Sequence, residues 1–506
     1  MKHKQPNILF LMADQMAASA LSIYGNPLVK TPNLEALAKE AVVFDSAYCN
    51  SPLCAPSRYV LMTGQLPAKI GAFDNAADLP ADIPTFAHYL RQQNYRTALS
   101  GKMHFCGPEQ LHGFEDRLTT DIYPADYGWF PNWDKPDSRP TWYHNMNSVT
   151  QAGPCVRTNQ LDFDDEVTFQ AKRYLHDYAR GKQEQPFCLT VSLTHPHDPY
   201  AIPEQYWNLY KDEEIELPKI TIPKSEQDPH SLRLQDVFAY DEQPITEQQI
   251  KNARRAYYGA ISYVDEKIGE VLKSLKDCGL DEDTIIVFSG DHGDMLGERN
   301  LWFKMSFFED SARVPMLIHA PKRFSAKRVS ESVSTMDILP TFVDIATQSA
   351  DYDYAMPIQG RSLVPHLEGK GGHDEVIGEY YGEGTVAPLF MIRRGDYKYI
   401  CCSQDPDQLF NLKSDPFELN NLTQDESHRD LVNSLRAEAV ERWDSESLTQ
   451  AVLISQRRRR LVVSALNKGK RKTWDHQPVF DSSELYMRNH IDLDDLEARS
   501  RFPKVD

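Results

Sequence analysis

The stretch Ile8-Leu9-Phe10-Leu11-Met12-Ala13, followed at once by Asp14-Gln15, indicates the fold class of this chain. A short apolar run without polar alternation is typical of a central strand in a sheet that is covered on both faces. Asp14 is therefore expected at the carboxyl end of this strand. In open α/β sheets, ligands bind just outside the carboxyl ends of the strands. We predict a buried, mostly parallel sheet with a functional site at that edge.

Other apolar runs of strand type follow, and three of them also end in polar side chains. These runs are residues 42–44, 95–100, 187–193, 284–288 and 314–319. The second leads to Lys102 and His104, the third to His195, and the fourth to Asp291 and His292. Strand ends of a parallel sheet meet at one edge, so we expect these side chains to converge on Asp14. Helical patterns between the runs complete an α/β fold, a large mixed, mostly parallel sheet flanked by helices.

The pattern changes after residue 370. Short runs at 376–381, 389–394, 397–401 and 408–412, separated by turn residues, predict a smaller C-terminal antiparallel sheet. We divide the chain into a catalytic α/β domain (1–370), an antiparallel-sheet subdomain (371–445) and an extended C-terminal tail (446–506). The tail holds the run Arg457 to Arg460 and, later, an acidic stretch at 492–497. We hypothesise that these two pair across a subunit interface, although such charge runs are more often solvated.

Composition excludes several classes of function. The net charge of -19 argues against a nucleic-acid partner, because affinity for a polyanion needs clustered Lys and Arg. The eight cysteines show no metal-ligand spacing and are expected to be reduced. The apolar run near the N-terminus is too short for a secretion signal, and no stretch reaches the roughly 20 apolar residues that span a bilayer. We expect a cytoplasmic protein with no membrane partner.

The stretch Cys54-Ala55-Pro56-Ser57-Arg58, continuing to Thr63-Gly64, is the strongest candidate for the chemistry. Pro56 suits the first turn of a helix, where a nucleophile feels the positive end of the helix dipole. Arg58 in the same turn is a bidentate partner for sulfate or phosphate oxygens. Each residue alone also has an ordinary structural reading: a cysteine is often buried packing, an aspartate a helix cap, and a lysine a surface charge.

The complete set of motifs resembles the sulfatase family, within the alkaline-phosphatase-like superfamily. Residues 54–64 are similar to the family signature, and Tyr95-Arg96-Thr97-Ala98 with Gly101-Lys102-Met103-His104 is similar to its second signature. The resemblance spans about residues 6 to 425. It implies that a formylglycine-generating or other sulfatase-maturing enzyme oxidises Cys54 to formylglycine.

The resemblance also implies a metal site. Asp14, Asp291, His292 and residue 54 correspond to ligands of one divalent cation. Gln15 is a possible further ligand. It stands where many relatives have a second aspartate, so this metal site has one negative charge fewer than theirs. A mainly oxygen shell favours Ca²⁺ over Mg²⁺ or Mn²⁺.

The same resemblance implies catalytic roles for five further side chains. Arg58 holds the nucleophile, while Lys102 and Lys304 bind sulfate oxygens. His195 is expected to protonate the leaving alcohol, and His104 to deprotonate residue 54 when sulfate is released. Cations are needed where negative charge develops on the sulfate and leaving oxygens.

The tail indicates the substrate. Lys472-Thr473-Trp474-Asp475 and Ser483-Glu484-Leu485-Tyr486-Met487-Arg488 resemble the C-terminal extension of choline sulfatases. That likeness implies hydrolysis of choline O-sulfate to choline and sulfate by a homo-oligomer, a dimer or tetramer. A trimethylammonium group favours aromatic faces and a nearby carboxylate. Trp129, in an irregular aromatic-rich segment, and Glu383 are our candidates for these contacts.

Three alternatives stay open. A phosphonate or phosphate ester hydrolase of the same superfamily can share the cysteine signature, and an arylsulfatase would use the same site. A catalytically idle homologue could bind quaternary amines or serve a structural role. A damaged site would mark that last class, yet the cysteine, arginine, lysines and histidines named above are all present.

Overall fold

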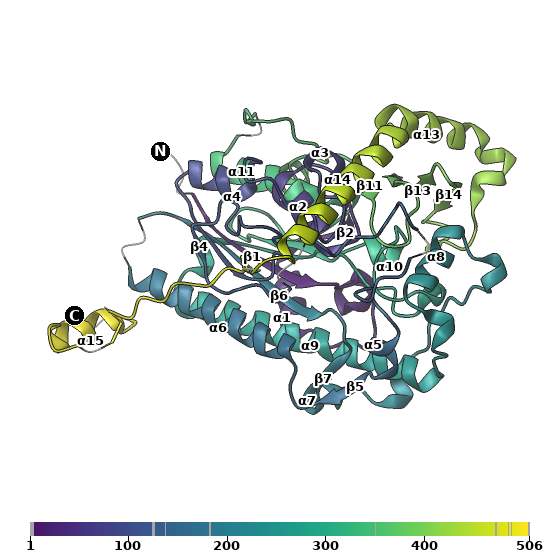
Figure 1. The fold of residues 1–506 in the computed structure, drawn as a ribbon. Helices are drawn as coiled ribbons and strands as arrows, with labels where there is room; N and C mark the ends of the chain where they lie inside the picture. Colours follow the sequence, from purple (N-terminus) through teal and green to yellow (C-terminus); the bar gives the residue numbers. More distant parts are fainter. Residues whose placement is uncertain are drawn as a thin grey trace.

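The computed structural model describes residues 5–123, 127–136, 138–181, 184–349, 351–470, 473–483, 485–486 and 488–503. Figure 1 shows helices packed on both faces of a large central sheet, with a smaller sheet at one side of the body. The long C-terminal segment leaves the body and ends in α15 (Leu493–Ser500), far from the central sheet (Figure 1). Lys472, Glu484 and Met487, quoted for the tail resemblance, lie outside the described residues.

The central sheet has eight strands in the order β10-β2-β9-β8-β1-β6-β3-β4. Its strands are β1 (Asn7–Asp14), β2 (Ala41–Tyr48), β3 (Arg96–Gly101), β4 (Asp116–Arg117), β6 (Phe187–Pro196), β8 (Thr284–Gly290), β9 (Met316–His319) and β10 (Lys327–Ser334). Strand β9 is antiparallel to β2 and to β8, whereas the other neighbouring strands pair in parallel. The predicted mixed, mostly parallel sheet is confirmed.

Four adjacent parallel strands, β8-β1-β6-β3, form the part of the sheet that positions the site. Every residue of β1, β6 and β8 is buried, as expected for apolar runs covered on both faces. In register, Ala13 pairs with Gly290 of β8 and Leu193 of β6. The residues that follow these strands therefore meet at one edge, as the sequence predicted.

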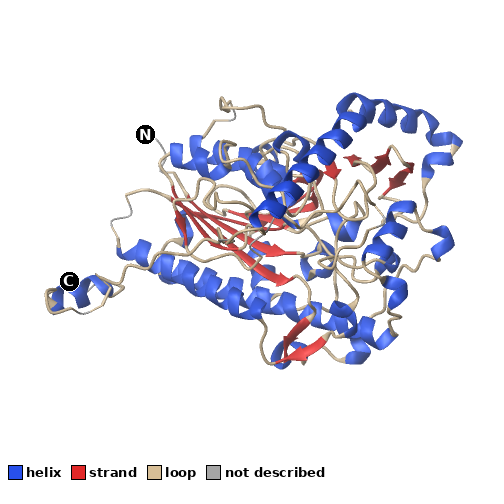
Figure 2. Cartoon of the chain, viewed as in Figure 1, coloured by secondary structure: helices blue, strands red, loops and turns tan. Residues whose placement is uncertain are grey.

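Helices cover the two faces of this sheet (Figures 1 and 2). On one face, α6 (Asn159–Arg180) and α9 (Glu247–Asp277) pack on β6 and on each other. Thr246 and Gln249 form a capping box at the start of α9. On the other face lie α2 (Cys54–Thr63), α4 (Phe86–Gln92) and α11 (Ile338–Thr347). Shorter helices are α1 (Pro32–Ala38), α3 (Pro67–Ile70), α5 (Asn147–Thr150), α7 (Glu204–Trp207), α10 (Glu309–Ala312) and α12 (Val364–Leu367).

The predicted C-terminal antiparallel sheet is also confirmed. Its strands follow the chain in order: β11 (Glu375–Tyr380), β12 (Leu389–Arg394), β13 (Tyr397–Cys402) and β14 (Asp405–Asn411). Helix α13 (Arg429–Arg442) packs on β12 and β13. Trp443, which follows α13, stacks on Phe390 with ring centroids 4.5 Å apart. The apolar cluster around this pair also includes Val60 of α2 and Leu66, so it joins the small sheet to the catalytic domain.

Several elements differ from the sequence prediction. Strand β10 was missed because polar and charged residues occupy much of an edge strand. Helix α8 (Pro229–Val237), whose first turn is capped by Asp228, was not among the predicted elements. A two-stranded sheet, β5 (Gly153–Cys155) with β7 (Ala201–Pro203), was also missed. The largest difference is α14 (Ser445–Leu466), a helix of 22 residues at the start of the predicted tail.

All eight cysteines are free thiols. Among the described residues, no helix combines the length and the apolar composition needed to cross a membrane.

Candidate active site

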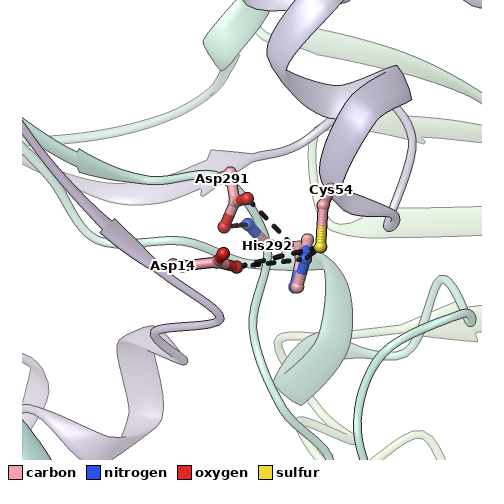
Figure 3. Close-up of side chains that lie close together, drawn as sticks. All are labelled: Asp14, Cys54, Asp291 and His292. Atoms are coloured by element: carbon pink, nitrogen blue, oxygen red, sulfur yellow. Dashed lines mark hydrogen bonds and ion pairs between the residues drawn. The ribbon is translucent and has the colours of Figure 1, made fainter. Parts of the chain in front are cut away.

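Four side chains form a compact buried group at the predicted edge of the sheet. Asp14 ends β1, Cys54 opens α2, and Asp291 and His292 directly follow β8. One potential ligand atom from each lies within 4.8 Å of the others. Figure 3 shows the four side chains pointing toward one another from these separate elements. The convergence predicted from strand ends is thus present for this group.

Helix α2 delivers Cys54 to the group through its first turn. Leu53 is extended and its carbonyl accepts the first helical bond, from Ser57 N at 2.9 Å. The Ser57 hydroxyl donates to the carbonyl of Asp291 at 2.5 Å, which ties the helix start to the end of β8. The Cys54 sulfur lies 3.2 Å from His292 Nε2 and 3.9 Å from Asp14 Oδ1. Residue 54 therefore sits at a helix N-terminus, as the position of Pro56 predicted.

The donor set of this group fits one divalent cation. His292 Nδ1 lies 3.0 Å from the carbonyl of Gly293, so its proton is used there and Nε2 keeps a lone pair toward the group. Asp14 and Asp291 add carboxylate oxygens, and residue 54 adds a fourth position. Two carboxylates, one imidazole nitrogen and a nucleophile position are suitable ligands for a divalent metal.

Gln15, the possible extra ligand, directs its amide elsewhere. Its Oε1 accepts a bond from Lys304 Nζ at 2.7 Å, and its Nε2 donates to Asp294 Oδ2 at 2.6 Å. The backbone of Gln15 contacts the group, because its N–H donates to Asp291 Oδ1 at 3.0 Å. The amide side chain thus positions Lys304, a role that the sequence did not indicate.

Three buried cations surround the carboxylates. Arg58 Nε donates to Asp291 Oδ2 at 2.9 Å, and Arg58 Nη1 donates to the carbonyl of Lys102 at 2.6 Å. The ammonium of Lys102 forms an ion pair with Asp14 and lies 4.5 Å from the ring centroid of Tyr123. Lys304 is the third cation. All three side chains are 1% exposed or less, so their charges act at low dielectric.

The electrostatic field at residue 54 favours negative charge. Burial raises the pKa of the Cys54 thiol, but Lys102, Lys304 and His292 outweigh burial and bring this pKa well below its usual value. For Asp14, burial and the neighbouring Cys54 raise the pKa, whereas Lys102 and His197 bring it down to about 2. An anionic oxygen bound to residue 54 would meet the same cations.

His104 stands beside residue 54 with a free imidazole. It is 2% exposed, and neither ring nitrogen has a hydrogen-bond partner among the described residues. Its backbone is held by Asp121, whose Oδ2 accepts from His104 N at 2.9 Å, and adopts a left-handed φ of 63°. A non-glycine residue in this region is strained, and such strain clusters at functional sites. The His104 ring is therefore held in a fixed position, and its two ring nitrogens are available for a role in catalysis.

The side chain of His195, the predicted acid, lies on the helix side of β6. His195 Nδ1 lies 2.7 Å from Asp164 Oδ2 of α6, and the ring meets Tyr263 of α9 edge-on at 5.1 Å. His197, two residues later and beyond the strand end, instead directs Nε2 to Lys304 Nζ at 2.7 Å. The histidine at the site is thus His197, which the sequence showed in the same His-Pro-His segment without indicating which ring faces the site.

A second polar group supports His197. Its Nδ1 lies 2.7 Å from the carbonyl of Asp198, and the Asp198 carboxylate lies 3.3 Å from the same nitrogen. The carboxylate of Asp198 also lies 3.6 Å from His144. Burial alone would raise the pKa of Asp198, but His197 and His144 have the larger effect and lower it. His144, His197 and Asp198 could geometrically hold a metal. Because the Lys304 ammonium contacts His197 Nε2, we interpret His144, His197 and Asp198 as a hydrogen-bonded proton-transfer network and not as a metal site.

Glu383 lies in the loop after β11 and is 2% exposed. Burial raises its pKa to about 7, Asp74 adds to this shift, and the charges of Lys304 and Cys54 also act on it. The Tyr380 hydroxyl lies 3.4 Å from Glu383 Oε2. Glu383 is therefore a buried carboxyl group whose pKa responds to the charges of the site, and its contact with a substrate stays a prediction.

Trp129 is half-buried in the irregular segment before the next described helix, α5. Its neighbour Phe130 is buried against the arginines of α14. The contact of Trp129 with a substrate stays a prediction.

The family model described as "Sulfatase" matches residues 6–348. The chain belongs to the sulfatase family. A second model, "Choline sulfatase enzyme C terminal", matches residues 450–502, and a third, "N-sulphoglucosamine sulphohydrolase, C-terminal", matches residues 297–444. The family prediction is confirmed, and so is the likeness of this sulfatase's tail to that of choline sulfatases.

Individual relatives agree. This sulfatase is 46% identical to a choline-sulfatase of Rhizobium meliloti (strain 1021), over 99% of both chains. It is 29% identical to an arylsulfatase of Clostridium perfringens (strain 13 / Type A), over 85% of this chain and 93% of the other. The structure of a phosphonate monoester hydrolase of Agrobacterium radiobacter aligns with a TM-score of 0.69 and 23% identity, over 86% of this chain and 95% of the other. That structural likeness shows the shared fold alone.

Proposed function

We propose that this sulfatase hydrolyses choline O-sulfate to choline and sulfate. The observation that supports this choice is Glu383, a buried carboxyl group within electrostatic range of the cations that face residue 54. A choline leaving group carries a permanent positive charge, and a carboxylate near the sulfate-binding cations is a fitting partner for it. The full-length similarity to a choline-sulfatase supports the same substrate.

Residue 54 is the proposed nucleophile, after oxidation of Cys54 to formylglycine by a separate maturing enzyme that uses an external electron acceptor. The hydrated aldehyde would supply an oxygen to attack sulfur and a second hydroxyl for later release of sulfate. Arg58 fixes the end of β8 through Asp291 and the segment after β3 through the carbonyl of Lys102. Lys102 and Lys304 are aimed at the space around residue 54 and would bind sulfate oxygens.

One divalent cation would be held by Asp14, Asp291, His292 and residue 54. When bound, it would polarise the sulfate group and stabilise negative charge at residue 54. We retain Ca²⁺ as the first proposal because both carboxylates are hard oxygen ligands. The imidazole of His292 and the engaged amide of Gln15 make Mn²⁺ a stronger competitor than the sequence suggested, with Mg²⁺ next.

Proton transfer involves two histidines. We assign protonation of the leaving alcohol to the pair of Lys304 and His197: the Lys304 ammonium shares a proton with His197 Nε2, that proton passes to the leaving oxygen, and His197 Nδ1 keeps its bond to the carbonyl of Asp198. His104, with two unpartnered ring nitrogens, would take the proton from residue 54 when sulfate leaves. His195 would serve packing through Asp164.

The cation subsite is proposed to contain Glu383 and Trp129. Tyr143 lies close enough to Glu383 to feel its charge. Burial raises the pKa of Tyr143, and the negative charge of Glu383 raises it further. A cavity of about 370 Å³ opens beside the same loop and is lined by Trp133, Tyr143 and Gly384 among others. Aromatic faces and one carboxylate are the groups that favour a quaternary ammonium ion.

We further propose that the protein is a homo-oligomer and that residues 446–506 serve assembly and extend the substrate pocket. Beyond α14, exposed apolar side chains follow the extended segment, including Val479 (96% exposed), Phe480 and Leu493. A chain that leaves the body with apolar residues exposed is suited to cover a second copy. Eight free thiols support the proposal of a reducing, cytoplasmic location.

The test is a comparison of substrates on one preparation coexpressed with the maturing enzyme. Sulfate release from choline O-sulfate should exceed, in kcat/KM, the hydrolysis of p-nitrophenyl sulfate and of a p-nitrophenyl phosphonate monoester. Faster turnover of the phosphonate would favour the phosphonate hydrolase alternative. Faster turnover of the aryl sulfate would favour an arylsulfatase.

A further inference from the structure

Helix α14 buries a polar face against the catalytic domain. Val452, Ser455, Gln456 and Arg459 are buried on this face, whereas Arg457 and Arg458 are exposed. The spacing 452, 455, 456 and 459 is that of one side of an α-helix. Val452 joins an apolar cluster with Phe73 and Tyr381. Figure 1 shows the helix crossing the body close to α2 and α3.

This face holds the aromatic segment that follows Trp129. The guanidinium carbons of Arg459 and Arg460 lie 4.6 and 5.7 Å from the ring centroid of Phe130. Gln456 Oε1 accepts from the backbone N–H of Trp133 at 3.0 Å. Residues 130–134 contain no helix or strand, and their backbone makes only local turn bonds, from Phe130 N to Gly128 O (3.1 Å) and from Lys135 N to Asn132 O (2.9 Å), among the described residues. The contacts with α14 therefore do much to fix where the segment lies.

The exposed end of the same segment is held by charge. Arg460 Nη1 donates to Asn132 Oδ1 at 2.9 Å, and Arg457 Nη2 donates to Asp134 Oδ1 at 2.7 Å. Arg460 also pairs with Asp134. Three of the four consecutive arginines are therefore engaged within the chain, and pairing of the run with the acidic stretch 492–497 across a subunit interface stays a prediction.

Arg459 makes one further contact, toward the active site. Its Nη1 and Nη2 form a bidentate ion pair with the carboxylate of Asp74, and both side chains are nearly inaccessible (6% and 1% exposed). Asp74 is near enough to Glu383 for its charge to act on that group. The next residue, Asn75, accepts from Ala55 N at 3.0 Å, which anchors this loop to α2 independently of Arg459.

We propose that Arg459 is a positioning residue that sets selectivity for a cationic leaving group, and that Arg457 and Arg460 complete this clamp. The clamp fixes Phe130, and with it the neighbouring Trp129, and α14 also holds Asn132 and Trp133, which line one side of the cavity beside Gly384. Arg459 also neutralises the charge of Asp74. The carboxylate of Glu383 is then the one available to bind the cationic leaving group. The sulfate end is held by other residues, Asp14, Asp291 and Arg58, and does not depend on the clamp.

This inference rests on the proposed function, and the test separates the two. KM and kcat are measured for choline O-sulfate and for p-nitrophenyl sulfate, whose leaving group has no cation. In Arg459→Met, KM for choline O-sulfate should rise about tenfold or more, because a small displacement of a positioning group is costly. Turnover of p-nitrophenyl sulfate should stay within about threefold of wild type. Arg459→Lys should recover part of the difference, since a lysine can pair with Asp74 but not bidentately.

Arg458→Met is the matched control, because it removes one charge from the same run at a position exposed to solvent. It should leave both substrates unchanged. If Arg459→Met folds poorly, the double variant Asp74→Asn/Arg459→Met avoids a buried unpaired carboxylate and should show the same selective loss. An equal loss on both substrates, or no loss, overturns the inference. A wild-type protein inactive on choline O-sulfate instead contradicts the proposed function.

Discussion

The sulfate end and the leaving-group end of this active site are built in different ways. The sulfate end lies at one edge of the central sheet, where Asp14 ends β1, and Lys102 and Asp291 follow β3 and β8. The leaving-group end combines an irregular aromatic segment near residue 130 with a loop after β11 and helix α14, which both come more than 200 residues later in the sequence. The regular end supplies chemistry common to a family, while the irregular end can change without disturbing it.

The largest effect is expected at residue 54. Cys54→Ala removes the proposed nucleophile, so sulfate release from every substrate should fall by about a thousandfold or more. Steady-state assays on choline O-sulfate and p-nitrophenyl sulfate measure this loss. Cys155→Ala, at a partly buried cysteine of β5, is the control and should retain activity. Retention of more than a tenth of wild-type activity by Cys54→Ala would contradict the assignment.

Lys102→Ala should reduce both activities by similar factors, about a hundredfold or more, because Lys102 is proposed to stabilise charge on the sulfate oxygens that all substrates share. The ratio of kcat/KM for choline O-sulfate to that for p-nitrophenyl sulfate should stay constant. A change in this ratio would mean that the two ends of the site are not separable.

His197→Ala should distinguish the substrates by their leaving groups. The choline alcohol needs a proton as it departs, whereas p-nitrophenolate is stable without one, so the loss should be about a hundredfold for choline O-sulfate and much smaller for the aryl sulfate. His195→Gln, which keeps a polar side chain next to Asp164, should not show this selectivity. The reverse pattern would restore His195 as the acid.

Glu383→Gln should give the smallest loss, about tenfold in kcat/KM and confined to choline O-sulfate. Burial raises the pKa of Glu383 to about 7, so the free enzyme holds the protonated, neutral form below that pH. The kcat/KM for the cationic substrate should therefore rise as pH increases through about 7. This rise should be absent for p-nitrophenyl sulfate and in the variant. An identical pH profile for both substrates would remove Glu383 from the cation subsite.

Much of the sulfate end could be predicted from the sequence because strand geometry does the positioning. An apolar run that ends in Asp14 or Asp291 implies both burial and location, and the four metal-site residues converge as expected. The sequence does not distinguish the positions of His195 and His197, because β6 continues through Pro196, which keeps His195 within the strand and facing the helices. Periodicity alone does not show where a strand ends to within two residues.

The leaving-group end was predicted less completely for a different reason. Helix α14 was missed because its buried face carries Ser455, Gln456 and Arg459, which hydrophobic periodicity does not recognise. Those residues are buried because Asp74, Phe130 and the backbone of Trp133 provide partners from distant parts of the chain. Burial of a polar face depends on such long-range pairing, and no local pattern encodes it.

The most direct test of the central claim, that residue 54 carries the chemistry as formylglycine, is the mass of the peptide that contains it. The protein is coexpressed with a maturing enzyme, digested and measured by mass spectrometry alongside an activity assay on choline O-sulfate. The account predicts the lower mass of the aldehyde form, with activity proportional to the modified fraction. Full activity in a preparation whose residue 54 is entirely an unmodified thiol would contradict it.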